Sequence, residues 1–71
     1  MSKRAEDYLR AILEVARGKG YARVKDVADV LNVKPPSVVE MLRKLDALGL
    51  VEYRRRDGIV LTEEGTKIAE V

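Results

Sequence analysis

The sequence contains neither cysteine nor histidine. The absence of cysteine excludes a disulfide framework and a thiolate metal site. The hydroxyl groups of the serines, threonines and tyrosines have no imidazole or thiol beside them to activate them as nucleophiles, and no glycine-rich phosphate loop is present. The residue inventory therefore argues against an enzyme.

Long apolar runs are also absent. The N-terminal residues Met1-Ser2-Lys3-Arg4 lead directly into a charged amphipathic pattern, and no run is long enough for a signal peptide or a membrane span. We expect a soluble, cytoplasmic protein without a membrane partner. A chain this short buries only about 60% of its unfolded surface, so residues 1–71 should form a single domain with one core.

The net charge of +2 says little about partners, but its distribution is informative. Residues 17–56 hold ten basic residues against five acidic ones, whereas residues 1–16 are neutral and residues 57–71 are net negative. A basic middle between neutral and acidic ends suits a surface that faces a polyanion. A generally charged soluble surface is the alternative that this pattern leaves open.

The segment 35–48 has the pattern of a helix with two different faces. A period of 3.6 residues places five apolar residues on one stripe that would pack on a core: Val38, Met41, Leu42, Leu45 and Leu48. The opposite face mixes small, apolar and charged residues that no core requires: Pro36, Val39, Glu40, Arg43, Lys44 and Ala47. We interpret this second face as the one that recognises a partner.

A shorter apolar segment precedes this helix across the three residues 32–34. Its apolar residues are Val27, Ala28, Val30 and Leu31. Small Ala28 allows close helix approach, Asn32 tolerates the left-handed conformation that a tight turn needs, and Val38 closes the core. This spacing predicts a helix-turn-helix. Two packed helices of any small bundle remain the alternative.

The remaining segments complete this arrangement. A first helix over residues 3–17 should be capped by Ser2 and ended by Gly18, and the extended segment 21–23 should pair with a later hairpin. The helix over residues 25–31 has no good capping residue at its start. We expect these segments to surround the same core.

Two β-rich runs, 50–55 and 59–61, flank an Asp57-Gly58 turn, which is a strong hairpin signal. Three consecutive arginines, residues 54–56, lie near its tip, where a polyanion would neutralise their mutual repulsion. A merely solvated edge is the alternative. The hairpin therefore predicts a wing over residues 51–61 that contacts phosphates.

Thr62 should cap a last helix over residues 63–71. In it, Ile68, Ala69 and Val71 begin an apolar face whose partner would come from further chain or from a second subunit. The order is helix, helix, helix, hairpin, helix. We therefore predict a mainly α fold with a small β-hairpin: a winged helix-turn-helix of three helices, a β wing and the start of a fourth helix.

The helix over residues 35–48 is the predicted recognition helix, and the position of each residue along it predicts what that residue contacts. The N-terminal part of such a helix enters the major groove deepest, so its first turns meet base edges while later turns climb toward the backbone. At Ser37, exposed N–H groups, the helix dipole and a hydroxyl should form a phosphate site. The predicted base contacts are Lys34, Pro36, Val39 and Glu40. The predicted phosphate contacts are Lys25, Ser37, Arg43, Lys44, Arg54, Arg55 and Arg56.

Four stretches carry a resemblance to a known family: Glu6-Asp7-Tyr8-Leu9, Gly20 to Val24 leading into Asp26-Val27-Ala28, Leu31-Asn32-Val33 before Pro36-Ser37-Val38-Val39, and Leu45 to Val51. Together they resemble the metal-dependent repressors of the diphtheria toxin repressor and manganese transport regulator type. The resemblance implies a transcriptional repressor whose winged helix binds a palindromic double-stranded DNA operator as a homodimer, under the control of Fe(II) or Mn(II).

By the same resemblance, Asp7 matches a metal ligand of the family. Arg10, one turn later, does not match the glutamate of the manganese type, although iron-type members carry arginine there, and no histidine completes the site. We expect no metal to be bound by this chain alone. The chain is then either the DNA-binding part of a longer protein or a short relative without metal control. From the residues alone, Asp7 is more often a solvated carboxylate paired with Arg10.

A winged helix that serves protein assembly without binding DNA is the alternative function, because a fold does not determine a function. Three arginines beside a helix N-terminus favour DNA over such a module. Retention on DNA that falls steeply with salt would separate the two functions.

Overall fold

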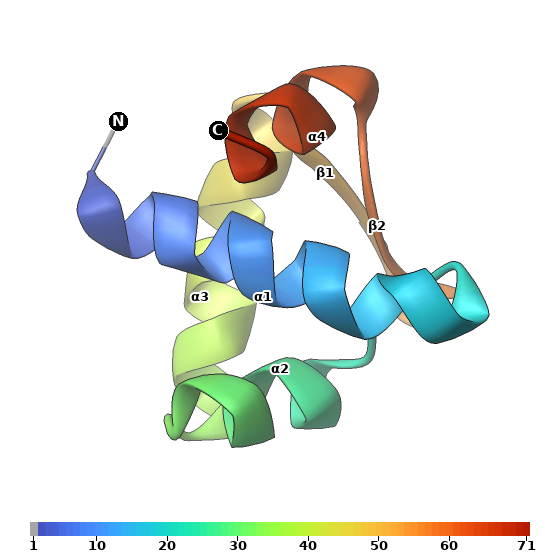
Figure 1. The fold of residues 1–71 in the computed structure, drawn as a ribbon. Helices are drawn as coiled ribbons and strands as arrows, with labels where there is room; N and C mark the ends of the chain where they lie inside the picture. The colour runs from blue at the N-terminus through green and yellow to red at the C-terminus, as the bar shows by residue number, and fades with distance from the viewer. Residues whose placement is uncertain (1) are drawn as a thin grey trace.

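The computed structural model describes residues 2–71 as four helices and one antiparallel hairpin (Figure 1). The elements are α1 (Lys3–Lys19), α2 (Val24–Leu31), α3 (Pro35–Ala47), β1 (Val51–Arg54), β2 (Gly58–Leu61) and α4 (Glu63–Ala69). Helix α1 crosses α3, with α2 and α4 packed on α1 on opposite sides (Figure 1). This is the predicted winged helix-turn-helix, with the hairpin as its wing.

Helix α1 begins as the sequence predicts but ends later. The hydroxyl of Ser2 accepts a hydrogen bond from the Ala5 N–H at 3.2 Å. The predicted stop at Gly18 is wrong, because α1 continues to Lys19 and ends where Gly20 adopts φ 86° and donates to the Ala16 carbonyl at 2.6 Å. A glycine inside a helix costs only about 1 kcal/mol relative to alanine, so the left-handed position decides where the helix ends.

The turn between α2 and α3 depends on Asn32. This residue has φ 55° and ψ 48°, and the next residue, Val33, donates its N–H to the Ala28 carbonyl at 3.0 Å. The predicted left-handed asparagine is confirmed. Helix α2 begins at Val24 and, as expected, no side chain caps its start.

Both ends of α3 follow from local chemistry. Pro35 and Pro36 occupy its first two positions, where a missing N–H costs little. At the other end Gly49 has φ 75°, its N–H donates to the Asp46 carbonyl, and the Leu50 N–H donates to the Leu45 carbonyl, each at 2.9 Å. These two bonds form a Schellman motif, which reverses the chain into the wing.

The core lies where helices α1, α2 and α3 meet the hairpin. Its fully buried large side chains are Leu9, Ile12, Val27, Val38, Leu42, Leu45, Val51 and Ile59. The predicted place of Leu48 on the core stripe is wrong, because Leu48 is 65% exposed, and Val30, in the apolar segment before the turn, is also 57% exposed. The chain leaves α3 at Leu48, so Leu50 takes the buried place. With 3.6 residues per turn, Val30 lies about 110° around α2 from the stripe that faces the core.

The hairpin pairs Val51 with Leu61 at its base and Arg54 with Gly58 at its tip. Ala22 and Ile59 exchange two backbone hydrogen bonds, of 2.8 and 2.7 Å, which confirms that the 21–23 segment joins the hairpin. Gly58 has φ 96°, and a Cβ there would lie 2.8 Å from the Ala22 carbonyl oxygen. The wing is therefore packed closely on the loop between α1 and α2.

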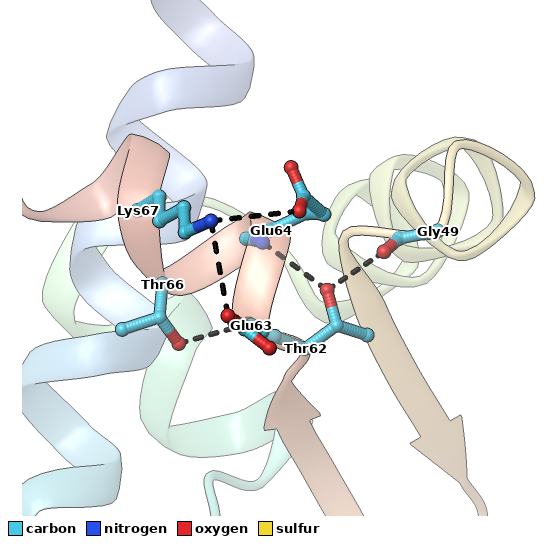
Figure 2. A network of polar contacts seen from close by, with 7 residues as sticks. Gly49, Thr62, Glu63, Glu64, Thr66 and Lys67 are labelled. Carbon is cyan, nitrogen blue, oxygen red and sulfur yellow. Dashed lines mark hydrogen bonds and ion pairs between the residues drawn. The ribbon is translucent and has the colours of Figure 1, made fainter.

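Helix α4 is docked on this chain. Thr62 caps it, because its hydroxyl accepts from the Gly65 N–H at 3.1 Å and donates to the Gly49 carbonyl at 2.7 Å (Figure 2). The predicted need for an outside partner is wrong for Ala69, which is buried where α4 packs on α1, and for Ile68, which packs against the same core. Val71 remains 90% exposed. No helix within residues 2–71 is long and apolar enough to cross a membrane.

Candidate DNA-binding surface

The outer face of α3 presents the residues that the sequence predicts for base contacts. Lys34 at the N-cap, Pro36 in the first turn and Glu40 one turn later are exposed, and Val39 beside them is half-buried. Arg43 and Lys44 continue the same face toward the C-terminal end and are also exposed. The opposite side of the helix packs in the core.

The phosphate site predicted at the N-terminus of α3 is wrong in one respect. Pro35 and Pro36 have no N–H, and the Ser37 N–H already donates to the Lys34 carbonyl at 3.0 Å. Backbone donors are therefore scarce in this first turn. Any contact between Ser37 and a phosphate must come from its hydroxyl.

A small cavity of about 90 Å³ joins α3 to the first turns of α1. Its lining residues are Arg4, Tyr8, Ser37, Glu40, Met41 and Lys44. Three predicted contact residues thus meet here, together with Arg4, which the sequence analysis missed. Tyr8 is only 2% exposed, and its hydroxyl has no hydrogen-bond partner among the described residues.

The three arginines of the wing do not act as one cluster. Arg54 lies 3.7 Å from the Glu52 carboxylate and 4.0 Å from that of Asp57, on the side of the wing that carries Val60. Arg55 is the next residue along the chain, and it lines a separate groove toward α3. Within residues 2–71, Arg55 and Arg56 take part in no ion pair.

The groove between α3 and the wing has a volume of about 360 Å³ and is lined by Val39, Arg43, Tyr53 and Arg55. Tyr53 is half-buried, and its N–H donates to the Asp46 carboxylate at 3.3 Å. The sequence does not identify Tyr53 as part of this surface, because the pattern of β1 does not show which side of the strand lies beside α3. Among the described residues, those that line the groove supply two guanidinium groups and no carboxylate.

Arg23, after Arg4 and Tyr53, is a third residue near this surface that the sequence does not identify. Its guanidinium donates to the Arg56 carbonyl at 2.9 Å and lies 5.0 Å from the centre of the Tyr21 ring. This contact ties the tip of the wing to the loop before α2. Lys25 is exposed in the first turn of α2, and it lines neither of the two cavities beside α3.

The metal site implied by the resemblance is not formed by these residues. Asp7 is half-buried on α1, and no three acidic or histidine side chains come together within residues 2–71. The expected pairing of Asp7 with Arg10 is not seen, since Arg10 donates to the Val71 carbonyl at 3.0 Å. One carboxylate does not fit the octahedral oxygen and nitrogen sites that Fe(II) and Mn(II) prefer.

Comparisons with known proteins agree with this architecture. The chain is 48% identical over 65 residues to the HTH-type transcriptional regulator MntR of Shouchella clausii, an alignment that covers 92% of this chain and 46% of that protein. It superposes on the structure of T. acidophilum IdeR with a TM-score of 0.84 at 36% identity, covering 97% of this chain and 32% of that one.

The structure of the manganese regulator SloR gives a TM-score of 0.77 at 33% identity, over 97% of this chain and 32% of that one. The chain spans about half the length of the curated relatives it matches. Residues 1–59 match the family model described as iron dependent repressor, N-terminal DNA binding domain. The chain belongs to this iron-dependent repressor family.

Proposed function

We propose that this chain is the DNA-binding domain of a transcriptional repressor that binds double-stranded DNA sequence-specifically, with α3 in the major groove and the wing on phosphates. The observation that carries the proposal is the surface formed by α3 and the wing. It presents an exposed arginine from each of the two elements, Arg43 and Arg55, neither of which takes part in an ion pair within residues 2–71, around a groove whose described lining residues include no carboxylate. Such a surface suits a polyanion.

Lys34, Pro36, Val39 and Glu40 are the proposed base contacts. Pro36 and Val39 offer apolar surface for the thymine methyl, Glu40 can accept from the cytosine amino group, and Lys34 can donate to guanine. The proposed phosphate contacts are Lys25, Ser37, Arg43, Lys44, Arg54, Arg55 and Arg56. Arg54 must exchange its ion pairs with Glu52 and Asp57 for a phosphate, which costs little because all three side chains are exposed.

The proposal includes a homodimer on a palindromic operator in the cytoplasm, as the family resemblance implies. A dimer of recognition helices reads two half-sites about one helical turn apart. Control by Fe(II) or Mn(II) would need ligands beyond Asp7. We therefore assign metal control to a longer protein that would contain this domain.

The test is binding to duplex DNA at several salt concentrations, followed by selection of bound sites from random duplexes. We expect log K to fall linearly with log[salt], with a slope of about −0.9 per neutralised phosphate, and the selected sites to share a common sequence. Binding that is insensitive to salt would favour the alternative function, a winged helix used for protein assembly. Salt-sensitive binding without a shared sequence would leave only non-specific DNA binding.

A further inference from the structure

We propose that Arg43 of α3 and Arg55 of the wing bind one and the same DNA phosphodiester, held in the groove that they line with Tyr53 and Val39. This inference rests on the proposed function and deepens it. It replaces two independent phosphate contacts by a single clamp formed by two elements. The clamp would fix the position of the wing relative to the recognition helix on DNA.

The groove between α3 and the wing is positively charged. Its four lining residues include two guanidinium groups and no acidic group, and neither arginine takes part in an ion pair within the described chain. Two like charges at one concave site repel each other when it is empty. An anion between them removes that repulsion, and a guanidinium binds phosphate oxygens through a fork of N–H donors.

The groove is also large compared with a single water molecule. Its volume of about 360 Å³ is far larger than the roughly 30 Å³ that one water molecule occupies in the liquid. The groove therefore has room for a group much larger than a single water molecule, such as a phosphodiester. Tyr53 and Val39, the other two lining residues, can offer apolar surface to a deoxyribose.

Hydrogen bonds hold the two walls of the groove in place. The Tyr53 N–H bonds to the Asp46 carboxylate at 3.3 Å, and the Leu50 N–H bonds to the Leu45 carbonyl at 2.9 Å, so β1 is tied to the end of α3. Arg23 holds the Arg56 carbonyl at the tip. The two arginines are thus presented by walls whose separation is set before DNA arrives, which lowers the entropy cost of binding.

The experiment is a double-mutant cycle of Arg43→Ala and Arg55→Ala in this chain, measured by fluorescence anisotropy on one duplex over a salt series. If the two side chains share one phosphate, the double variant loses about 0.9 from the salt slope in total, whereas two separate phosphates would cost about 1.8. The affinity losses should also be clearly non-additive. Additive losses of affinity and slope would overturn the shared phosphate.

Arg54→Ala is the matched control, because Arg54 is an exposed wing arginine that lines a different cavity. The change in DNA-binding affinity caused by Arg54→Ala, whatever its size, should add fully to the change caused by Arg43→Ala. A coupling between Arg43 and Arg54 as large as that between Arg43 and Arg55 would overturn the assignment. All three side chains are exposed, so the variants should keep the wild-type melting temperature.

Duplexes with a single uncharged methylphosphonate provide the independent readout. One position of the substitution should remove the effects of both Arg43→Ala and Arg55→Ala, and different positions for the two would overturn the proposal. Titration with inorganic phosphate separates the second source of the same anion. Saturable binding of free phosphate in the groove, combined with additive losses on DNA, would make it a free-phosphate site instead. If the wild-type chain fails to bind DNA at all, the proposed function itself is wrong.

Discussion

Gly65 in α4 packs directly against the backbone carbonyl of Leu50, so closely that a Cβ on Gly65 would overlap the carbonyl oxygen. Both residues are buried. The Leu50 carbonyl also accepts the Thr62 N–H at 3.1 Å, and the Thr62 hydroxyl bonds the neighbouring Gly49 carbonyl (Figure 2). The end of the recognition helix, the start of the wing and α4 are therefore joined at one place.

We predict that Gly65→Ala destabilises the domain by about 2 kcal/mol or more, because backbone rather than a flexible side chain occupies the space that the methyl group needs. Urea unfolding followed by circular dichroism measures the change. Gly18→Ala is the matched control: Gly18 lies within α1, and a methyl group there would have nothing within 4 Å, so the change should stabilise by about 0.5 to 1 kcal/mol. Equal effects at both positions would contradict the close packing of α4.

The second prediction concerns the turn of the helix-turn-helix. Asn32→Val should cost about 1 to 2 kcal/mol, because a β-branched side chain clashes in the left-handed conformation that Asn32 adopts with φ 55°. Asn32→Gly should change stability little, since glycine enters this region freely. The same unfolding measurement applies to both variants. A stable Asn32→Val variant would show that the turn tolerates another backbone path.

The turns of this fold could be predicted from the sequence because each depends on residues close in the chain. Asparagine and glycine tolerate the left-handed conformation, so Asn32 and Gly49 predict two positions that adopt it. The prolines at the start of α3 likewise predict the first turn of a helix. The sequence pattern does not decide between two glycines that lie close together at the end of a helix. Gly18 and Gly20 can both adopt the left-handed conformation, and in the structure Gly20 adopts it and ends α1.

The candidate site was predictable on α3 and much less so where other elements meet it. Periodicity alone identifies the outward face that contains Glu40 and Arg43. The contributions of Arg4 and Tyr53 depend on how α1 crosses α3 and on which side of β1 faces the helix, and no local pattern contains that information. The same limit explains why the sequence pattern places Leu48, at the end of α3, in the core, whereas the structure exposes it.

The third prediction concerns the buried hydroxyl of Tyr8, which has no partner among the described residues. An unsatisfied buried polar group costs about 1 to 3 kcal/mol, so Tyr8→Phe should leave stability unchanged or raise it by about 1 kcal/mol, as chemical denaturation would show. A loss of about 1 kcal/mol would instead show that the hydroxyl is hydrogen-bonded, for example to water in the adjoining 90 Å³ cavity.

The fourth prediction concerns metal. Because Asp7 has no partner ligands within residues 2–71, DNA binding by this chain should be unchanged by a chelator such as EDTA and by added Mn(II). Anisotropy with a fixed duplex measures this, with ionic strength held constant so that the ions do not act through screening. Binding that a chelator abolishes and Mn(II) restores would mean that the chain builds a metal site in a way these residues do not reveal.

The last prediction tests the register of the recognition helix. Glu40 is exposed in the part of α3 that should face base edges, and it shares a cavity with Ser37 and Lys44. A carboxylate there can accept from the cytosine amino group but repels phosphates, so it adds discrimination while lowering affinity. Glu40→Gln should relax or switch the preference at one base pair, by about 1 to 3 kcal/mol, and should raise non-specific affinity because one negative charge leaves the interface.

Selection from random duplexes, repeated with Glu40→Gln and with Arg43→Ala, measures both effects. Arg43 lies farther along α3, toward the wing, so its loss should weaken binding almost equally on every sequence and leave the selected site unchanged. The two variants thus separate base reading from phosphate contact on one helix. If Arg43→Ala altered the selected site while Glu40→Gln did not, α3 would be rotated about its axis relative to the groove, and the base contacts proposed for Lys34, Pro36 and Val39 would be wrong with it.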